Sequence, residues 1–390
     1  MVYLTREQEL MLSGEKGFIV AKMMELIVKM CEAYGCEKLV RVNHVHVSGV
    51  SYVNIGDYGL EFIKDIHSYR PRASVYTTTN PVCVDLTGLS RILSNEFIDK
   101  QLVINKYFEE MGFQPTYSCI PYYFRKPSVN EHLAWGESSA VIYANSVFGA
   151  RTNREGAPLT IASSITGYTY FAGMHMDENR VVKISLNVDG DVEPELYGAL
   201  GYWIGENIHE TPIIKGIVEN YSSIKIMLAS AAATGDFALI VIDKITPKGS
   251  YRVSDYLEKI SVGFKDIEEI VFRGKEEGYV LGYIGCPHLD PLEFRTLVEK
   301  FSNRRVKREC GFLVSIPYPF LSIFRSEIDF LRKRGVDVVA GTCPIVSKLT
   351  VKPDLVLTNS GKAFFYFKNI HGLNVRIASF ETIIDNVTEK

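Results

Sequence analysis

The sequence predicts an α/β protein built on parallel β-sheets that carry helices on both faces. Two observations support this prediction: short apolar strands recur along the chain, and segments with helical apolar spacing separate them. Such alternation requires crossover connections, which make neighbouring strands parallel and bury both faces of the sheet. The 390 residues are enough for two or three domains of ordinary size.

Local signals predict the N-terminal elements. Thr5 is expected to cap a first helix, with Gln8 completing a capping box. Apolar residues at helical spacing predict a second helix over 16–34, which Gly35 ends. The next expected elements are a strand at 38–42, a helix at 59–66 and a strand at 73–76.

Further along the chain, strands and helices are expected to keep alternating. Apolar runs predict strands at 237–245, 279–284, 311–316 and 336–341. Helical patterns are expected at 292–301 and 321–334. The sequence has no internal repeat and no low-complexity linker. We expect three α/β domains, over residues 1–130, 131–245 and 246–390.

Charge and hydropathy exclude two classes of partner. The net charge is −3 and no block of Lys and Arg occurs, so nucleic acid is not an expected partner. The longest apolar runs are too short to cross a bilayer, and the N-terminus lacks a signal-peptide pattern. We therefore expect a cytoplasmic protein without membrane contact.

The seven cysteines are odd in number and widely spaced. In a large cytoplasmic chain this pattern argues against a disulfide framework and favours free thiols or metal ligands. Cys31 and Cys36 flank the end of the second helix, where we expect Cys31 to pack as a free thiol. Cys83 and Cys310 are also expected to be packed thiols.

Three other cysteines share one local pattern. Cys119, Cys286 and Cys343 each lie at a strand end or in a loop, with a proline one or two residues later. Ligands of open α/β sheets bind at the carboxyl ends of strands, and proline gives a rigid turn. Three thiolates would hold an iron–sulfur cluster and leave one iron open as a Lewis acid. Inert packed thiols are the alternative, whereas a structural zinc is disfavoured because no Cys-x-x-Cys pair occurs.

Several longer stretches carry a family resemblance. They are the three cysteine loops and residues 46–62, 76–81, 134–146, 144–156 and 357–366. Over essentially its whole length the sequence resembles the large subunit of aconitase X, the two-subunit branch of the aconitase superfamily. The resemblance implies an aconitase-like fold, in which α/β/α domains with parallel sheets pack around a central cleft.

The resemblance also implies an activity and a cofactor. The expected enzyme is a hydro-lyase that converts (R)-5-phosphomevalonate into trans-anhydromevalonate 5-phosphate in the archaeal modified mevalonate pathway. Cys119, Cys286 and Cys343 match the family's cluster ligands, and a [4Fe–4S] cluster is expected, with [2Fe–2S] as an alternative. The chain ends at Lys390, soon after the last matching stretch. This implies that a separate small subunit carries the swivelling domain and a serine base.

Three residues are catalytic candidates, each with a plainer alternative. Glu137 would handle a proton or bond the iron-bound hydroxyl, although a carboxylate at a helix start also pairs with the helix dipole. His288 would donate to a cluster sulfur or to the substrate hydroxyl. Lys362 resembles part of an anion-binding helix start. The alternative for His288 and Lys362 is an exposed, solvated side chain.

Arg151 and Arg154 are the leading candidates for holding the anionic substrate, because guanidinium binds carboxylate and phosphate in bidentate fashion. Taken alone, an arginine in a polar loop is usually solvated. The other candidates are small polar residues or offer backbone amides: Ser48, Gly49, Val50, Ser51, Thr78, Thr79, Asn80, Asn145, Ser146 and Ser360. For these residues, turn formation or helix capping is the competing interpretation.

Other functions compete with this hypothesis. Cys83 and Val84 stand where the family resemblance predicts small residues, so a cis-3-hydroxy-L-proline dehydratase is the second candidate enzyme. From another class, an iron–sulfur sensor that binds RNA is disfavoured by the lack of a basic face. A scaffold with inert cysteines is the plainest alternative.

Overall fold

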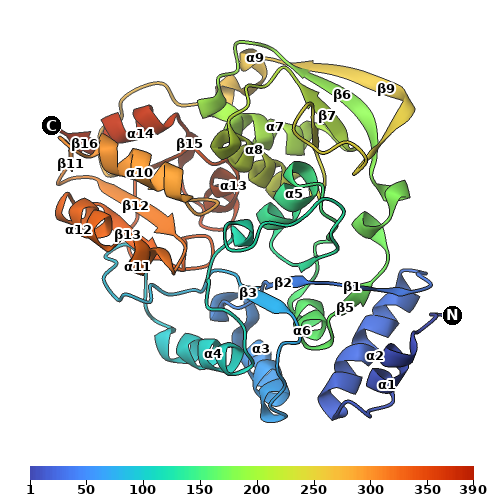
Figure 1. Cartoon of the computed structure of the whole chain (residues 1–390). Coiled ribbons are helices and arrows are strands. Elements are labelled where there is room, and N and C mark those ends of the chain that lie inside the picture. The colour runs from blue at the N-terminus through green and yellow to red at the C-terminus, as the bar shows by residue number, and fades with distance from the viewer.

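The computed structural model describes residues 1–390 and contains three groups of strands with their helices. Its N-terminal part holds a parallel sheet with strand order β3-β2-β4 and an antiparallel pair, β1 with β5. The strands are β1 (Leu39–Arg41), β2 (His44–Val47), β3 (Tyr76–Thr79), β4 (Ala134–Trp135) and β5 (Tyr168–Tyr170). The helices are α1 (Arg6–Leu12), α2 (Phe18–Ala33), α3 (Tyr52–Ser68), α4 (Ile98–Glu110) and α6 (Ala157–Thr166), in the lower half of Figure 1.

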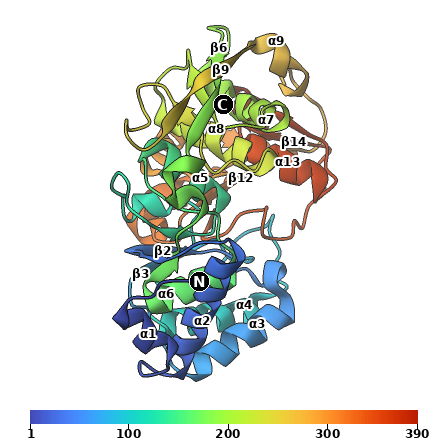
Figure 2. The same ribbon diagram turned by 90° about the vertical axis from the view of Figure 1, so that its right-hand side faces the viewer.

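The middle of the chain forms a four-stranded parallel sheet with order β8-β7-β6-β9. Its strands are β6 (Val181–Val188), β7 (Pro212–Lys215), β8 (Val241–Ile242) and β9 (Arg252–Val262). Helices α5 (Ser138–Val147), α7 (Tyr197–Asn207), α8 (Tyr221–Thr234) and α9 (Phe264–Ile267) accompany it. Figure 2 shows this part stacked above the N-terminal part, with α5 between the two sheets.

The C-terminal part forms a five-stranded parallel sheet with order β13-β12-β10-β14-β15. Its strands are β10 (Val280–Ile284), β12 (Gly311–Ile316), β13 (Asp337–Ala340), β14 (Leu355–Thr358) and β15 (Val375–Ile377). The helices are α10 (Pro291–Lys300), α11 (Phe320–Ile323), α12 (Arg325–Lys333), α13 (Gly361–Asn369) and α14 (Phe380–Val387). A short antiparallel pair, β11 (Arg305–Val306) and β16 (Thr388–Glu389), lies at one side.

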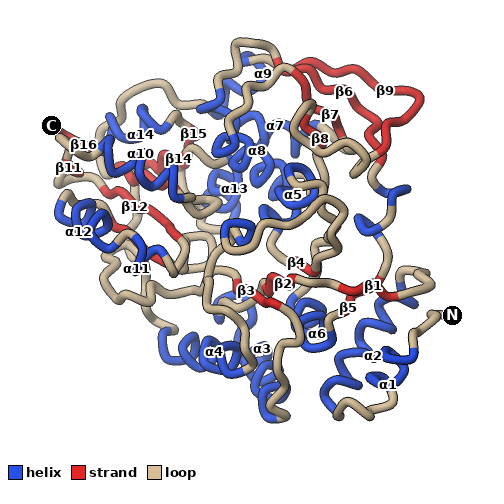
Figure 3. The backbone as a smooth tube through the Cα atoms, viewed as in Figure 1, coloured by secondary structure: helices blue, strands red, loops and turns tan.

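Loops and short helices complete the chain. Five 3-10 helices are η1 (Pro121–Tyr123), η2 (Gly173–His175), η3 (Asp177–Asn179), η4 (Pro194–Leu196) and η5 (Glu268–Ile270). Figure 3 shows that long loops occupy the region where the three parts meet. No helix combines the length and apolarity needed to cross a membrane. The parallel sheets confirm the predicted α/β class.

Many predicted elements are confirmed. Thr5 and Gln8 form the capping box of α1, and Gly35 follows α2 with a positive φ of 66°. The strand predicted at 311–316 is β12. The strands predicted at 279–284 and 336–341 are β10 (Val280–Ile284) and β13 (Asp337–Ala340), which agree with the prediction within one residue at each end.

Four predicted elements are wrong in extent. The helix predicted at 59–66 is α3, which spans Tyr52–Ser68. The strand predicted at 73–76 begins only at Tyr76, and the one at 237–245 shrinks to Val241–Ile242 because only these residues pair with β7. The helix predicted at 321–334 is two helices, α11 and α12, separated at Phe324. Beyond residue 130, β4 pairs with β2 and β5 with β1. The three predicted domain ranges stay a prediction.

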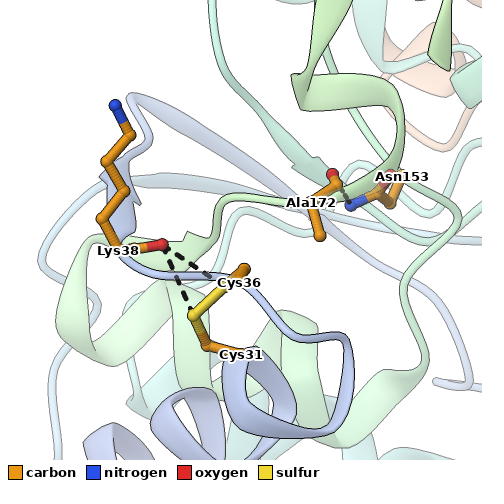
Figure 4. The surroundings of a disulfide bond; sticks show 5 residues. All are labelled: Cys31, Cys36, Lys38, Asn153 and Ala172. Atoms are coloured by element: carbon orange, nitrogen blue, oxygen red, sulfur yellow. Dashed lines mark hydrogen bonds between the residues drawn. A yellow bond between two sulfur atoms is a disulfide. The ribbon is translucent and has the colours of Figure 1, made fainter. Parts of the chain in front are cut away.

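Cys31 and Cys36 form a disulfide, so the prediction of free thiols is wrong for this pair (Figure 4). Helix α2 ends after Ala33, and Gly35 turns the chain back so that the two Cα atoms lie 4.9 Å apart. Both sulfur atoms lie near the Lys38 carbonyl oxygen, at 3.5 and 3.4 Å. The other five cysteines are free.

Candidate active site

A small cavity of about 40 Å³ lies where carboxyl ends of strands from two sheets meet. It is lined by Asn80, Pro81, Cys119, Glu137, Gly285, Cys286, Pro287, Cys343, Ile345, Val346 and Lys362. The lining segments follow β3, β4, β10 and β13, or begin α13, except that Cys119 lies in the loop before η1. Three thiols, one carboxylate and one ammonium group therefore converge from residues up to 243 positions apart in the chain.

The turn that carries Cys286 is fixed by its backbone. Gly285 has a φ of 108°, which favours glycine, and a Cβ atom there would lie 2.4 Å from the Ser315 carbonyl oxygen. The Cys286–Pro287 peptide bond is cis. Beyond the turn, the His288 backbone N–H donates to the Cys119 sulfur at 3.2 Å. This bond ties two of the three thiol-bearing loops together.

Burial keeps the three free thiols protonated. It raises the pKa of Cys286 to about 11 and that of Cys343 to about 12, and it raises the pKa of Cys119 well above its ordinary value. The Lys362 ammonium partly offsets this effect at all three sulfurs. A bound cationic metal centre would reverse the balance, because metal ligation deprotonates thiols.

The donor set fits an iron–sulfur cluster better than a single ion. No group of three His, Cys, Asp or Glu side chains is placed to hold one metal ion. A single tetrahedral ion needs ligands that nearly touch, whereas a cluster spreads its thiolates around several iron atoms.

Glu137 and Lys362 form a buried ion pair at the cavity. Lys362 Nζ donates to Glu137 Oε1 and lies 3.1 Å from the Ser138 hydroxyl. Burial disfavours the ionised carboxylate, but the Lys362 charge and bonds from Ser139 outweigh it, and the pKa of Glu137 lies below its ordinary value. Burial disfavours the Lys362 ammonium, but Glu137 and the neighbouring acidic groups together outweigh burial and raise the pKa of Lys362. Both groups are charged.

Close helix packing places Lys362. Ser360 caps α13, its hydroxyl accepting from the Ala363 N–H at 3.1 Å, and it also lies beside the Cys286 thiol. A Cβ atom on Gly361 would lie 2.3 Å from the Gly198 carbonyl oxygen of α7. The first turn of α13 can therefore reach the cavity only because residue 361 has no side chain.

Asn80 connects the carboxylate to the first sheet. Its Nδ2 donates to Glu137 Oε2 at 3.3 Å, and its Oδ1 lies 3.4 Å from His46 Nε2. Thr78 and Thr79 do not line the cavity: the Thr78 hydroxyl contacts His44 and His46, and the Thr79 hydroxyl donates to the Gln114 carbonyl. Direct contact of these threonines with substrate has no support in this geometry.

The segment Ser48, Gly49, Val50 and Ser51 lies beside the cavity. The Ser51 hydroxyl donates to the Val346 carbonyl at 3.3 Å, and Val346 lines the cavity. Ser48 packs against Gly136, where a Cβ atom would lie 2.2 Å from the Ser48 hydroxyl oxygen. The segment leads into α3, whose N-cap is Ser51.

His288 is fully buried and does not line the cavity. The ring Nε2 of His288 donates to the Thr342 carbonyl at 3.2 Å. The hydrogen bond to the Cys119 sulfur comes from the His288 backbone N–H and not from the ring. Burial lowers the pKa of the His288 ring to about 3. The imidazole is thus a neutral link between the loops that carry Cys286 and Cys343.

Four predicted substrate residues lie elsewhere. Arg151 bonds Asn130, the His175 carbonyl and Asp177, and Arg154 makes an exposed ion pair with Asp236. Asn145 donates to the Thr152 and Ala238 carbonyls, and the Ser146 hydroxyl accepts from the Ile240 N–H. The structure does not bring these side chains to the cavity: three of them are used in buried or half-buried hydrogen bonds, and Arg154 pairs at the surface.

The structure adds residues that the sequence interpretation missed. Pro81 and Ser138 contact the site, and each directly follows a predicted residue, Asn80 or Glu137, which was the available signal. Lys225 lies behind the Cys286 turn, where it donates to the His288 carbonyl at 3.1 Å and pairs with Asp290 and Glu293. Its place in an apolar stretch of α8 gave no such signal.

Comparison with known proteins identifies the family. Models of the aconitase X first, second and third domains match residues 1–178, 179–272 and 279–389. The chain belongs to the aconitase X family. These matches divide it near 178 and 272, whereas the sequence-based ranges divide it at 130 and 245.

Full-length relatives accompany the family match. The chain is 34% identical to the phosphomevalonate dehydratase large subunit of Thermococcus kodakarensis, covering 98% of this aconitase X chain and 99% of the relative. It is 25% identical to a cis-3-hydroxy-L-proline dehydratase of Pseudomonas aeruginosa, covering 96% and 68%. The crystal structure of Thermococcus kodakaraensis aconitase X in its holo-form superposes with a TM-score of 0.87 at 32% identity, covering 99% and 100%. The chain is a hydro-lyase of the aconitase-like superfamily.

Proposed function

We propose that this aconitase X chain is the large subunit of a phosphomevalonate dehydratase. One observation carries the proposal: three thiols and the Glu137–Lys362 ion pair share a single buried cavity. The full-length similarity to phosphomevalonate dehydratase large subunits supports the choice of substrate. Cys119, Cys286 and Cys343 would hold a [4Fe–4S] cluster.

The reaction removes a proton from C2 of the substrate and hydroxide from C3. Bound in the cavity, the cluster would supply a Lewis acid for the departing hydroxyl. Lys362 places a positive charge near the anionic substrate, where a low-dielectric surrounding strengthens it. Glu137 is charged and accepts hydrogen bonds, so its role is to orient the substrate hydroxyl rather than to donate a proton.

The base that removes the C2 proton comes from a small partner subunit in this proposal. Within the cavity, Glu137 is committed to Lys362 and Asn80, and no neutral histidine lines the wall. A serine of a swivelling domain would complete the site. The backbone amides of residues 48–51, beside the cavity, are the proposed contacts for a carboxylate or phosphate of the substrate.

A cis-3-hydroxy-L-proline dehydratase is the second candidate, and one observation favours it. No arginine lines the cavity, since Arg151 and Arg154 are paired elsewhere. A phosphate group calls for more positive charge than an amino acid does. In the proposed enzyme the phosphate must therefore bind at the rim or against the partner subunit.

The test is anaerobic co-expression with the small subunit, followed by iron and sulfide analysis and assays with both substrates. Turnover of (R)-5-phosphomevalonate with cluster-level iron supports the proposal. Turnover of cis-3-hydroxy-L-proline alone would transfer the assignment to the second candidate. Iron-free protein after anaerobic handling would favour inert cysteines, and salt-dependent RNA binding would favour the sensor hypothesis.

A further inference from the structure

A chain of buried hydrogen bonds runs from the cavity into the first sheet. His46 Nε2 lies 3.4 Å from Asn80 Oδ1, and His46 Nδ1 lies 2.8 Å from the Thr78 hydroxyl. The same hydroxyl lies 3.0 Å from His44 Nε2 and, at the longer distance of 3.4 Å, near the Val45 carbonyl oxygen. His44, His46 and Thr78 are fully buried and face one another across the paired strands β2 and β3. None of the three lines the cavity.

The chemistry of each group sets the direction of donation. Asn80 gives its NH₂ group to Glu137, so its carbonyl oxygen faces His46 and must accept. His46 then carries its proton on Nε2. With Nε2 protonated, Nδ1 of a neutral ring accepts, and the Thr78 hydroxyl donates to it. Thr78 in turn accepts from His44 Nε2. Every donor in the chain points toward Glu137.

The rings are neutral, as this order requires. Burial lowers the pKa of His46 to about 4, although Glu137 and Asn80 oppose the shift. Burial also lowers the pKa of His44 well below its ordinary value. A neutral His46 has one donor and one acceptor, so donation from Nε2 to the Asn80 oxygen leaves Nδ1 to accept from the Thr78 hydroxyl.

We propose that His46 and Thr78 are positioning residues that lock the Asn80 amide with its NH₂ group toward Glu137 and the cavity. The second amide hydrogen of Asn80 is then available to a substrate oxygen, a role that rests on the proposed dehydratase function. Thr78 acts at one remove, because loss of its hydroxyl leaves His46 Nδ1 without a donor and frees the ring that holds the Asn80 oxygen. Thr78, expected from the sequence to bind substrate, acts in this proposal without touching it.

The tautomer can be measured without substrate or cofactor. Nitrogen NMR of histidine-labelled protein should show His46 as the Nε2–H tautomer at neutral pH. Thr78→Val should remove the hydrogen bond to Nδ1 and shift the Nδ1 resonance while Nε2 stays protonated, and Thr78→Ser should restore the original signal. A wild-type Nδ1–H tautomer, or a Thr78→Val spectrum identical to wild type in a folded protein, would overturn the proposal.

Kinetics test the link to Asn80. His46→Leu should lower kcat/KM about tenfold, mainly through KM, as expected for a coupled pair. His46→Gln, which keeps an N–H donor, should recover most of the loss. In an Asn80→Ala background the same His46→Leu change should cost less than about twofold. Equal losses in both backgrounds would mean that His46 does not act through Asn80.

A matched control separates positioning from simple destabilisation. His175 is also a buried neutral histidine, bonded to His132 at 2.9 Å and remote from the cavity lining. His175→Leu should lower stability without changing KM. If wild-type protein turns over neither candidate substrate, the proposed function fails, whereas the NMR result still decides the tautomer.

Discussion

Two buried lysines show how the same charge serves different ends in this fold. Lys225 and Lys362 both lie near the start of a helix, and both pair with carboxylates. Lys362 lies at the wall of a cavity, whereas Lys225 is enclosed by protein and also donates to the His288 carbonyl. The contrast teaches that cavity contact, rather than burial or pairing, separates a candidate binding group from a structural one.

The carboxylates around the two lysines differ as well. Lys362 pairs with a single carboxylate, that of Glu137, whose pKa is lowered despite burial. Lys225 serves two. Burial opposes ionisation of both, and the lysine offsets it fully only for Asp290, whose pKa is lowered to about 2, while that of Glu293 is raised to about 7. Lys225 therefore shares its charge between two carboxylates, and these ion pairs hold the loop after Cys286 in place.

The largest effect is expected for Lys362→Met. Removing the cavity cation should lower kcat/KM by about 10²–10³, in line with the loss of one electrostatic group in an active site. Kinetics of the two-subunit enzyme, corrected for iron content, measure this. Lys362→Arg is the control that keeps the charge. If Lys362→Met lowers kcat/KM tenfold or less, which corresponds to at most about 1.4 kcal/mol, Lys362 does not act in the site.

Lys225→Met should mainly affect stability. Leaving Asp290 and Glu293 buried without their cation should lower the free energy of unfolding by about 3–5 kcal/mol. Denaturant unfolding measures this loss. The control is the triple variant that adds Asp290→Asn and Glu293→Gln to Lys225→Met, because it also removes the unpaired carboxylate charges. Kinetic loss as large as that of Lys362→Met, in protein that is still folded and loaded, would erase the distinction between the two lysines.

Glu155 extends the comparison to a buried carboxyl with no lysine. Burial raises its pKa from 4.5 to about 8, and its Oε2 has no hydrogen-bond partner. Between these values the unfolded chain releases the proton and the folded one keeps it, so stability is full below pH 4.5 and falls by up to about 1.4 kcal/mol per pH unit up to 8. Glu155→Gln should flatten this slope.

Unfolding of wild type and Glu155→Gln at pH 5 and pH 8 measures the difference. The exposed Glu258→Gln variant is the matched control, because it removes the same charge from the surface strand β9. Parallel pH profiles for wild type and Glu155→Gln would show that Glu155 is ionised in the folded chain.

The smallest effect is expected at the disulfide. Only five positions separate Cys31 and Cys36, so the closed loop contributes about 2 kcal/mol by chain entropy. Cys36→Ser should lower stability by that amount, with Cys310→Ser as the control at a free thiol. Thiol titration of unfolded, unreduced, metal-free protein should give five groups. Seven groups would show that the pair is reduced.

How far the sequence predicts this molecule depends on the element. Strands β10, β12 and β13 were predictable because each is a short, continuous apolar run bounded by turn residues. The run at 237–245 was not, since its apolar side chains are buried by packing rather than by strand pairing. Apolarity reports burial but does not tell which neighbour supplies it.

The candidate site divides in the same way. Cysteines and prolines at strand ends indicated the cavity, because parallel strands bring their carboxyl ends to one edge. Arg151 could not be judged, since its partner Asp177 lies 26 positions away in a loop with no signal. Strand periodicity does place Thr78 on one face and Thr79 on the other, so the inward face of Thr78 was predictable once β2 was recognised as its neighbour.

The cavity takes its walls from the ends of β3 and β4 in one sheet and of β10 and β13 in another. A ligand bound in the cavity therefore contacts both sheets, and its binding free energy adds to the free energy of unfolding of the two sheets together. At a concentration 100 times the dissociation constant this amounts to about 2.7 kcal/mol. The melting curve is thus a measure of occupancy: loaded protein should melt in one cooperative step, and stripped protein should melt earlier, with the two sheets free to separate.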